Sequence, residues 1–263
     1  MKRAKRVTSA QNPLLKSIRR AARSGALTGE GCCLAEGLHL LEEALRSRIP
    51  IEAVVASEAA FSRVSAVAGD SPVAAVVVPD EVFSGLAATE NSQGVVALVR
   101  PPSWALDQIL GPASLVLALD GVQDPGNAGS MVRAAEAFGA SGVLFLKGSV
   151  SPYNPKAVRA SAGSLFRIPL TAGVSAEDFL AGVSGRRLTV YVASPSSGEP
   201  ADAADLVRPC ALVIGSEGRG ASSVFRRCQA IHIPTFGVES LNAALAAGIL
   251  LYEARRQRGG QEG

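Results

Sequence analysis

LVLALDGVQDPGNAGSMVRAAEAFGASGVLFL, residues 115–146, places a helix pattern between two short apolar runs. The apolar runs suit buried strands, and a helix is the usual crossover between two parallel strands. The stretch therefore predicts a strand, a helix and a second, parallel strand. A Pro-Gly turn, Asn127 and Arg133 interrupt its apolar character. These residues form either an ordinary turn and a helix with a solvated arginine, or a functional site.

The alternation of strands and helices continues through the second half of the chain. Strands are predicted at 114–120, 142–147, 187–194, 210–215 and 230–234. Helices are predicted at 128–139, 154–166, 175–184, 221–228 and 240–258. Apolar strands without alternation are typical of parallel sheets that are covered on both faces. The predicted fold class is therefore α/β, with a mostly parallel sheet.

The first hundred residues show a second α/β pattern. It predicts helices at 12–24, 34–47, 61–69 and 80–88, and strands at 51–57, 73–79 and 94–100. The polar run TENSQG (89–94) has the composition of an exposed loop. Two prolines at 101–102 favour an extended link. We therefore predict a domain over 1–100, a linker over 101–113 and a second domain over 114–263.

The composition indicates a soluble globular protein. Hydrophobic residues make up 48% of the 263 residues and aromatic residues only 5%, so Ala, Val and Leu must build most of the core. No apolar run is long enough to span a membrane. The basic start, MKRAKR, is followed by polar residues instead of the apolar core of a signal peptide. We expect a cytoplasmic protein without a membrane partner.

Cysteine and histidine give no indication of a metal site or of a Cys-His or Ser-His-Asp centre. The sequence has four cysteines without CxxC spacing, and they are predicted to be buried free thiols. Its two histidines, His39 and His232, lie in apolar patterns and no HExxH is present. Structural roles are expected for both histidines, and no metal is expected.

Basic residues gather at the start of the chain. The residues that precede the first acidic residue, Glu30, include Lys2, Arg3, Lys5, Arg6, Lys16, Arg19, Arg20 and Arg23. A cluster of this kind suits binding to the phosphates of a nucleic acid, although a solubilising arm would have the same composition. Because Lys16, Arg19 and Arg20 fall within a helix pattern, we predict a folded RNA-binding surface that includes them.

Three polar, glycine-containing loops follow predicted strands, at 120–133, 213–222 and 233–245. In open α/β sheets, ligands bind where such loops leave the carboxyl ends of the strands. Neither GxGxxG nor GxxxxGK[ST] is present. The second loop could equally end a strand and begin a helix, with Ser222 or Ser223 as the cap. In the third loop, Ser240 could be a plain N-cap on the Asn242 amide, although Asn242 has poor helix propensity there.

The three loops together resemble one family. The order is N-x-G-x3-R (Asn127, Gly129, Arg133), then IGSEGRG at 214–220, then IPTFGVESLN at 233–242. Over about 114–258, these motifs resemble the SpoU/TrmH class of RNA ribose 2′-O-methyltransferases in the SPOUT superfamily. TSAQNPLLK, AEGLHLLEEAL and NSQGVVAL resemble that family's N-terminal substrate-binding domain, which has a ribosomal-protein-like α/β fold.

The resemblance implies a deep trefoil knot, homodimers and S-adenosyl-L-methionine as the cofactor. The residues that it implies for cofactor binding are Gly215, Ser216, Gly218, Ile233 and Leu241. Those that it implies for the reaction centre are Asn127, Arg133, Glu217, Ser240 and Asn242. In the implied dimer, the first motif of one chain lies near the cofactor of the other. Thr235 departs from the family, which often has Met there, and should alter pocket packing more than activity.

Methyl transfer to a ribose hydroxyl requires alignment of the two groups and removal of the hydroxyl proton. A free arginine is too basic to take that proton easily. We therefore expect Arg133 to orient the hydroxyl through its phosphate, with Glu217 holding Arg133 in place. Asn127 would bind the hydroxyl or position Arg133, and the general base stays unassigned. Arg159, in NPKAVRASAG beside Lys156, is either an RNA contact or part of a solvated helix face.

The resulting hypothesis is a dimeric enzyme that methylates a ribose in structured RNA. The resemblance of the N-terminal domain to that of rRNA-modifying members favours ribosomal RNA over transfer RNA. An RNA-binding protein that kept the fold and lost catalysis is the alternative from another class. The presence together of Asn127, Arg133, Glu217 and Asn242 speaks against it. A dinucleotide-binding dehydrogenase is a third alternative, disfavoured because the glycine fingerprint is missing.

Overall fold

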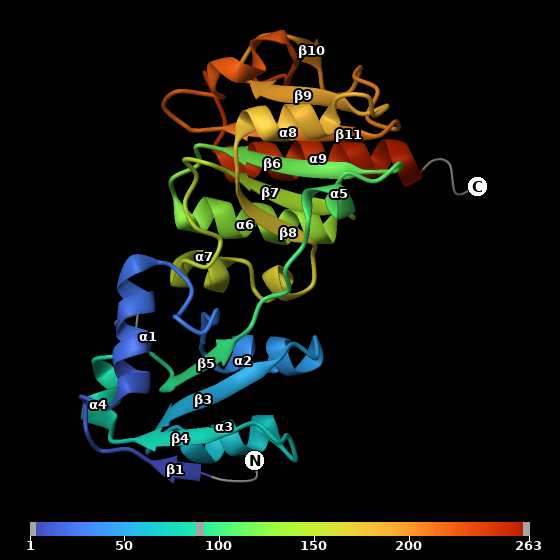
Figure 1. Cartoon of the computed structure of the whole chain (residues 1–263). Helices are drawn as coiled ribbons and strands as arrows, with labels where there is room; N and C mark the ends of the chain where they lie inside the picture. Colours follow the sequence, from blue (N-terminus) through green and yellow to red (C-terminus); the bar gives the residue numbers. More distant parts are fainter. Residues whose placement is uncertain (1–3, 88–91, 260–263) are drawn as a thin grey trace. The chain divides into compact units, whose positions relative to one another are not determined.

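The structure is a computed structural model that describes residues 4–87 and 92–259, so Lys2, Arg3 and part of the predicted 89–94 loop lie outside it. The chain divides into two compact units (Figure 1). One unit contains the chain up to Pro102 together with Tyr153–Arg167, and the other contains Ser103–Pro152 and the chain from Ile168 onward.

This division differs from the predicted limits because Tyr153–Arg167 was assigned to the second domain. In the structure, helix α7 (Pro155–Ala160) packs on strand β2 (Cys33–Glu36) of the first unit. After it, the Arg167 guanidinium donates a hydrogen bond to Glu43 Oε2 at 2.6 Å. The helix predicted at 154–166 stops at Ala160, and a short 3₁₀ helix follows at Ser164–Phe166. Gly163 between them has φ +90°, and a Cβ there would lie 2.6 Å from Glu43, so only glycine fits the break.

The first unit is a five-stranded mixed sheet in the order β1-β4-β3-β5-β2. Its strands are β1 (Ala4–Arg6), β2 (Cys33–Glu36), β3 (Ile51–Ser57), β4 (Ala75–Val78) and β5 (Val95–Val99). Its remaining helices are α1 (Pro13–Ser24), α2 (Leu38–Arg46), α3 (Phe61–Ala68) and α4 (Asp80–Ser84). Strand β4 pairs in parallel with β1 and β3, whereas β5 is antiparallel to β2 and β3. A core cluster that includes Leu15, Ile18 and Leu34 fills the space between α1 and the sheet.

The predicted helix at 34–47 is wrong over its first residues, because Cys33–Glu36 form strand β2. All four residues of β2 are buried, and they pair antiparallel with β5. Gly37, with φ +105°, separates the strand from helix α2. Leu34 has helical spacing from Leu38, but its side chain belongs to the sheet's core cluster. Strand β1 was not predicted either.

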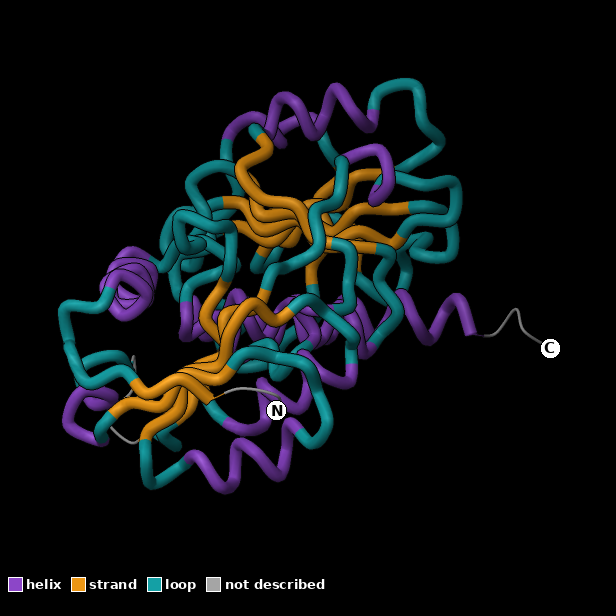
Figure 2. Tube along the Cα trace, turned by 60° about the horizontal axis from the view of Figure 1, so that its bottom comes forward, coloured by secondary structure: helices purple, strands orange, loops and turns teal. Residues whose placement is uncertain are grey.

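The second unit is a seven-stranded parallel sheet in the order β10-β12-β9-β11-β6-β7-β8. Its strands are β6 (Leu115–Asp120), β7 (Gly142–Leu146), β8 (Leu170–Val174), β9 (Thr189–Ser194), β10 (Glu199–Pro200), β11 (Cys210–Gly215) and β12 (Gln229–His232). Its helices are α5 (Leu106–Ile109), α6 (Pro125–Ala137), α8 (Ala176–Val183) and α9 (Ala243–Gly259). Helices cover both faces of this sheet (Figure 2), and α6 packs against α9. The predicted α/β class with a parallel sheet is confirmed.

Three details of the second unit differ from the prediction. The helix predicted at 221–228 is a 3₁₀ helix at Ser223–Arg227. Strands β8 and β10 were not predicted, and α5 lies in the segment predicted as a linker. No helix among residues 4–87 and 92–259 is long and apolar enough to cross a membrane.

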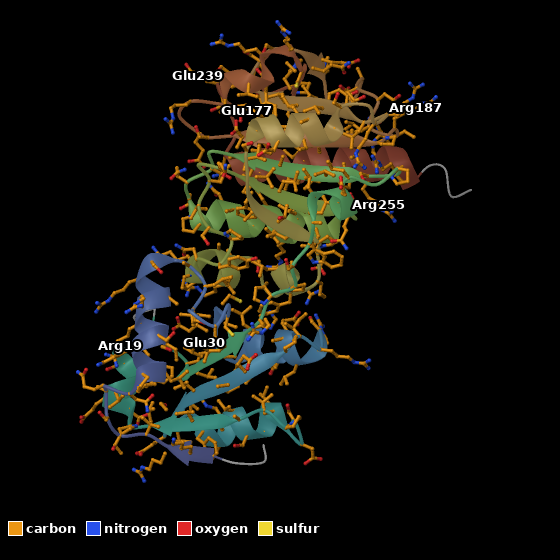
Figure 3. The ribbon with its side chains drawn as sticks, viewed as in Figure 1. Arg19, Glu30, Glu177, Arg187, Glu239 and Arg255 are labelled. Atoms are coloured by element: carbon orange, nitrogen blue, oxygen red, sulfur yellow. The ribbon has the colours of Figure 1, made fainter. Side chains whose placement is uncertain are left out.

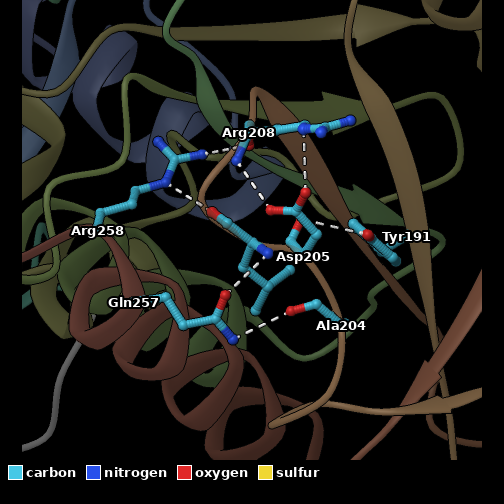
Figure 4. A network of polar contacts seen from close by, with 7 residues as sticks. Tyr191, Ala204, Asp205, Arg208, Gln257 and Arg258 are labelled. Atoms are coloured by element: carbon cyan, nitrogen blue, oxygen red, sulfur yellow. Dashed lines mark hydrogen bonds and ion pairs between the residues drawn. The ribbon is translucent and has the colours of Figure 1, made fainter. Parts of the chain in front are cut away.

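A polar network fixes the last turn of α9 (Figure 4). The Arg258 guanidinium donates to the backbone oxygens of Leu206, Arg208, Ala113 and Ser114, at 2.8, 2.9, 3.3 and 3.2 Å. Gln257 accepts from the Leu206 N–H at 3.0 Å and donates to the Ala204 oxygen at 3.1 Å. These segments precede β6 and β11, so α9 is anchored at the amino-terminal edge of the sheet.

Candidate functional site

The three polar loops begin at one edge of the parallel sheet. Strands β6 and β11 are neighbours, with Asp120 in register with Gly215 where each strand ends. Strand β12, which leads into the third loop, joins the same sheet through β9. The carboxyl ends of the strands therefore place residues 120–127, 215–222 and 233–242 together, as the predicted parallel order requires.

Hydrogen bonds join one predicted side chain from each of these loops. The Asn127 Nδ2 group donates to Glu217 Oε1, and Asn242 Nδ2 donates to Asn127 Oδ1 at 3.2 Å. Asn127 thus uses both ends of its amide and links residues that are 90 and 115 positions away. The structure brings these three predicted residues together, and their catalytic role stays a prediction.

Asn127 and Asn242 each lie at the N-terminus of a helix and take part in its cap. Asp124 caps α6 by accepting from the Asn127 N–H at 2.6 Å. Asn242 caps α9, because its Oδ1 accepts from the backbone N–H groups of Ala244 and Leu245 at 2.9 and 3.2 Å. The alternative that Ser240 caps this helix is therefore wrong. The argument from poor helix propensity is wrong as well, since Asn is among the preferred N-cap residues and lies just before the helix.

The second loop turns back tightly on itself. Ser216 and Gly220 form an antiparallel bridge with backbone hydrogen bonds of 3.1 and 2.8 Å. A Cβ on Gly215 would lie 2.1 Å from the backbone nitrogen of Ala221, so the loop closes only over a glycine. A hollow of about 210 Å³ opens beside this loop. Its lining residues are Val122, Gln123, Ser216, Glu217, Gly218 and Arg219.

Asp120 holds the far end of this loop, and the sequence did not identify it. Its side chain is 7% exposed, and its Oδ2 accepts from the Ser222 N–H at 2.5 Å. The signal in the sequence is an aspartate directly after the apolar run LVLAL, because a buried carboxylate requires a hydrogen-bond donor. Neither Ser222 nor Ser223 caps the following 3₁₀ helix with its side chain.

We call Asn127, Glu217 and Asn242 the bonded cluster. Arg133 lies apart from this cluster in its own chain. It is six residues beyond Asn127 on α6, which rotates it by about 240° around the helix axis. It lies with Ser130 and Ala137 on the exposed face of α6. The expected contacts of Arg133 with Glu217 and Asn127 are therefore absent from the described part of this chain. Glu217 accepts from Asn127 instead.

The predicted cofactor residues lie along the second and third loops. Gly215, Ser216 and Gly218 belong to the tight turn, Ile233 follows β12, and Leu241 precedes the α9 cap. Across 235–241, within the described chain, no backbone N–H donates an intramolecular hydrogen bond. Because residues 235–240 are exposed, these N–H groups are open to solvent and available to a bound group. Ser240 in the same segment is exposed.

The predicted RNA-binding residues lie in the first unit. Helix α1 begins with the Asn12 cap and Pro13, ends at Gly25 and buries Leu15 and Ile18. Lys16, Arg20 and Arg23 are exposed on its opposite face, whereas half-buried Arg19 donates to the Ala10 oxygen. Arg159 is exposed on α7 and so belongs to the unit of α1, not to the domain in which the sequence placed it.

The cysteines of the described chain are free and largely buried, without a disulfide. Burial raises the pKa of the Cys33 thiol to about 12, so this thiol is protonated and a poor nucleophile at neutral pH. No group of three or more His, Cys, Asp or Glu side chains in the described ranges is arranged to hold a metal ion.

Comparison with known protein families gives two matches. The SpoU rRNA Methylase family matches residues 114–252. The MRM3-like substrate binding domain matches residues 12–97. Together they cover the site loops of the second unit and most of the first unit. The family predicted from the sequence motifs is therefore confirmed.

Individual relatives extend the match over the chain. An uncharacterized tRNA/rRNA methyltransferase of Archaeoglobus fulgidus is 40% identical over 150 residues, which are 55% of this chain and 66% of that protein. The 23S rRNA (guanosine(2553)-2′-O)-methyltransferase RlmP of Bacillus subtilis is 29% identical over 95% of this chain and 99% of its own length. The crystal structure of an AdoMet-bound rRNA methyltransferase from Sinorhizobium meliloti has a TM-score of 0.82, at 31% identity over 96% and 98% of the two chains. With its bonded cluster at the edge of a parallel sheet, this chain belongs to the SpoU rRNA methylase family.

Proposed function

We propose that the protein transfers a methyl group from S-adenosyl-L-methionine to a ribose 2′-hydroxyl in ribosomal RNA. The observation that carries this proposal is the bonded cluster of Asn127, Glu217 and Asn242, which joins the three family loops at one edge of the sheet. The substrate class is supported by RlmP, an rRNA 2′-O-methyltransferase that this chain matches over 99% of its length.

The cofactor would bind along the second and third loops. When bound, S-adenosyl-L-methionine supplies an activated methyl group on its sulfonium. The unpaired backbone N–H groups of 235–241 and the backbone of Gly215, Ser216 and Gly218 would hold it. Ile233 and Leu241 are half-buried and would give apolar contacts. The AdoMet bound to the related S. meliloti enzyme supports the identity of the cofactor.

The side chains of the cluster would orient the ribose. Glu217 uses Oε1 to accept from Asn127, and the described chain gives its Oε2 no donor. Since Glu217 lines the hollow beside the second loop, its Oε2 can accept a hydrogen bond from the ribose hydroxyl there. Asn127, held by Asp124 and Asn242, fixes the carboxylate in this orientation. The general base stays unassigned.

Arg133 would act in the site of a second copy of the chain. It projects from the outer face of α6, away from its own cluster. The neighbouring helix α9 exposes Leu245 by 53% and Tyr252 by 55%, and Tyr252 packs edge-on against Phe138 near the end of α6. Apolar side chains that lie seven residues apart share a helix face, so α6 and α9 offer a surface suited to a homodimer.

The first unit would select the RNA, because its match is to a substrate-binding domain and α1 presents exposed cations. We propose that the second unit contains the trefoil knot of its family, formed by the second and third motifs. We propose residues 1–100 as the RNA-selecting domain and 114–263 as the catalytic domain, except that Tyr153–Arg167 of the second range packs with the first unit. A cytoplasmic location is a further part of the proposal.

Incubation with radiolabelled S-adenosyl-L-methionine and either ribosomal or transfer RNA tests the reaction. We expect label in ribosomal RNA, and nucleoside mapping should place it on a ribose oxygen. Label found only in transfer RNA would identify transfer RNA as the substrate instead. RNA binding without label in either would favour a non-catalytic RNA-binding protein, and NAD binding would favour a dehydrogenase.

A further inference from the structure

The segment that follows β11 has an unusual charge. Between residues 216 and 238 the sequence has three arginines and one acidic residue, Glu217. The guanidinium groups of Arg219, Arg226 and Arg227 form no hydrogen bond or ion pair with any described residue, and all three residues are exposed. We call these three residues the arginine surface.

The backbone beneath the arginine surface is firmly held. Phe225 is only 3% exposed, and its ring lies 6.2 Å from that of Phe179 on α8. Asp120 fixes the start of the segment through the Ser222 N–H. Because the buried ring precedes Arg226 directly, the two following guanidinium groups project from a fixed support.

The arginine surface adjoins the candidate site. Arg219 lines the same hollow as Glu217, two residues away, so one end of the surface lies beside the proposed position of the ribose. Arg226 and Arg227 extend it along the 3₁₀ helix. This 3₁₀ helix leads away from the hollow toward the start of β12, so a ligand needs several separated negative charges to reach from the hollow to Arg226 and Arg227.

Most arginines at the opposite, amino-terminal edge of this sheet form ion pairs or hydrogen bonds within the unit. Arg186 pairs with Asp107, Arg208 with Asp205 and Arg256 with Glu253, at 2.6, 3.1 and 2.7 Å. Arg258 is surrounded by backbone oxygens. Two exceptions, Arg187 and Arg255, are exposed and form no hydrogen bond or ion pair with a described side chain. They lie across the sheet from Glu239 of the third loop (Figure 3).

We propose that the arginine surface binds the RNA phosphates that flank the target ribose. RNA carries one phosphate per nucleotide, and the planar guanidinium group matches phosphate with two parallel hydrogen bonds. The surface thereby complements the α1 cations of the first unit and aligns the RNA at the reaction centre. This inference rests on the proposed function, because it takes RNA as the substrate.

The test compares two double variants of the full chain. R226Q/R227Q removes two charges from the arginine surface, and R187Q/R255Q removes two from the opposite edge. Fluorescence anisotropy with a labelled RNA hairpin measures affinity across a salt series. Each lost phosphate contact should flatten the plot of log affinity against log salt by about 0.7–0.9 units. R226Q/R227Q should therefore lower the slope by about 1.4–1.8 units, which is about 25- to 60-fold weaker binding at 0.1 M salt.

R187Q/R255Q should keep the wild-type slope, and both variants should bind S-adenosyl-L-methionine as the wild type does. Equal slopes in all three proteins would overturn the inference, as would equal flattening in both variants, which would mean that any surface charge attracts RNA. If R226Q/R227Q kept the wild-type salt slope for RNA but no longer bound an acidic protein, the arginine surface would be assigned to a protein partner instead. The anisotropy assay needs no methyl transfer, so failure of the proposed reaction is seen separately.

Discussion

Replacement of Asn242 by serine separates the two bonds that this side chain makes. Its Oδ1 caps α9, whereas its Nδ2 donates to Asn127 at 3.2 Å. Serine is an equally good N-cap but is too short to reach Asn127. Loss of one neutral hydrogen bond costs about 0.5–1.5 kcal/mol. Because 3.2 Å is at the long end of the normal range, the lower half applies, and kcat should fall about 2- to 5-fold.

Asn242→Ala is the matched variant that loses both bonds. Loss of the cap should cost about 1 kcal/mol of stability and lower the Tm by about 2–4 °C in a protein of this size. N242S should keep the wild-type Tm. Calorimetry gives the Tm, and initial rates at saturating cofactor and RNA give kcat. A wild-type kcat for N242S would refute the role of the Asn242–Asn127 bond. A Tm for N242S as low as that of N242A would refute the separation of the two functions.

Three further outcomes are expected. Arg133→Ala should abolish methyl transfer and leave calorimetric binding of S-adenosyl-L-methionine unchanged, so a collapse of cofactor affinity would make Arg133 part of the pocket. Gly215→Ala should weaken cofactor binding severely, because the added methyl group would lie 2.1 Å from a backbone nitrogen of the same loop; normal affinity in a titration would contradict this. Combined replacement of Lys16, Arg20 and Arg23 by glutamine should flatten the salt dependence of RNA affinity by about 2 units, and a parallel salt series would show that these residues only solubilise the chain.

The sequence predicted those elements whose local rules agree with their tertiary environment. Helix α1 has its Asn12 cap, its Pro13 and its Gly25, and it forms where the pattern placed it. Strands β6 and β11 are continuous apolar runs, and both are buried in a parallel sheet. Leu34 shows the limit of periodicity as a predictor. Its spacing from Leu38 suits one continuous helix, but it suits equally well a strand that ends before a glycine and is followed by a helix.

The candidate site was predicted as a set of loops but not as a set of contacts. Motif order identified Asn127, Glu217 and Asn242, which the structure joins by hydrogen bonds. Helical geometry alone could have separated Arg133 from Asn127, since six residues place two side chains on different faces. The role of Asp120 depends on the register of β6 and β11, which no local pattern specifies.

The placement of Tyr153–Arg167 in the first unit bears on the order in which the chain matures during synthesis. A fragment that ends at Pro102 would lack α7, leaving β2 without the helix that packs on it, and Glu43 without its bond from Arg167. The first unit therefore cannot complete itself as it leaves the ribosome and must wait until β6, α6 and β7 of the other unit have also been made. The two units are interleaved in sequence, because residues 103–152 of the second interrupt the first and residues 153–167 of the first interrupt the second.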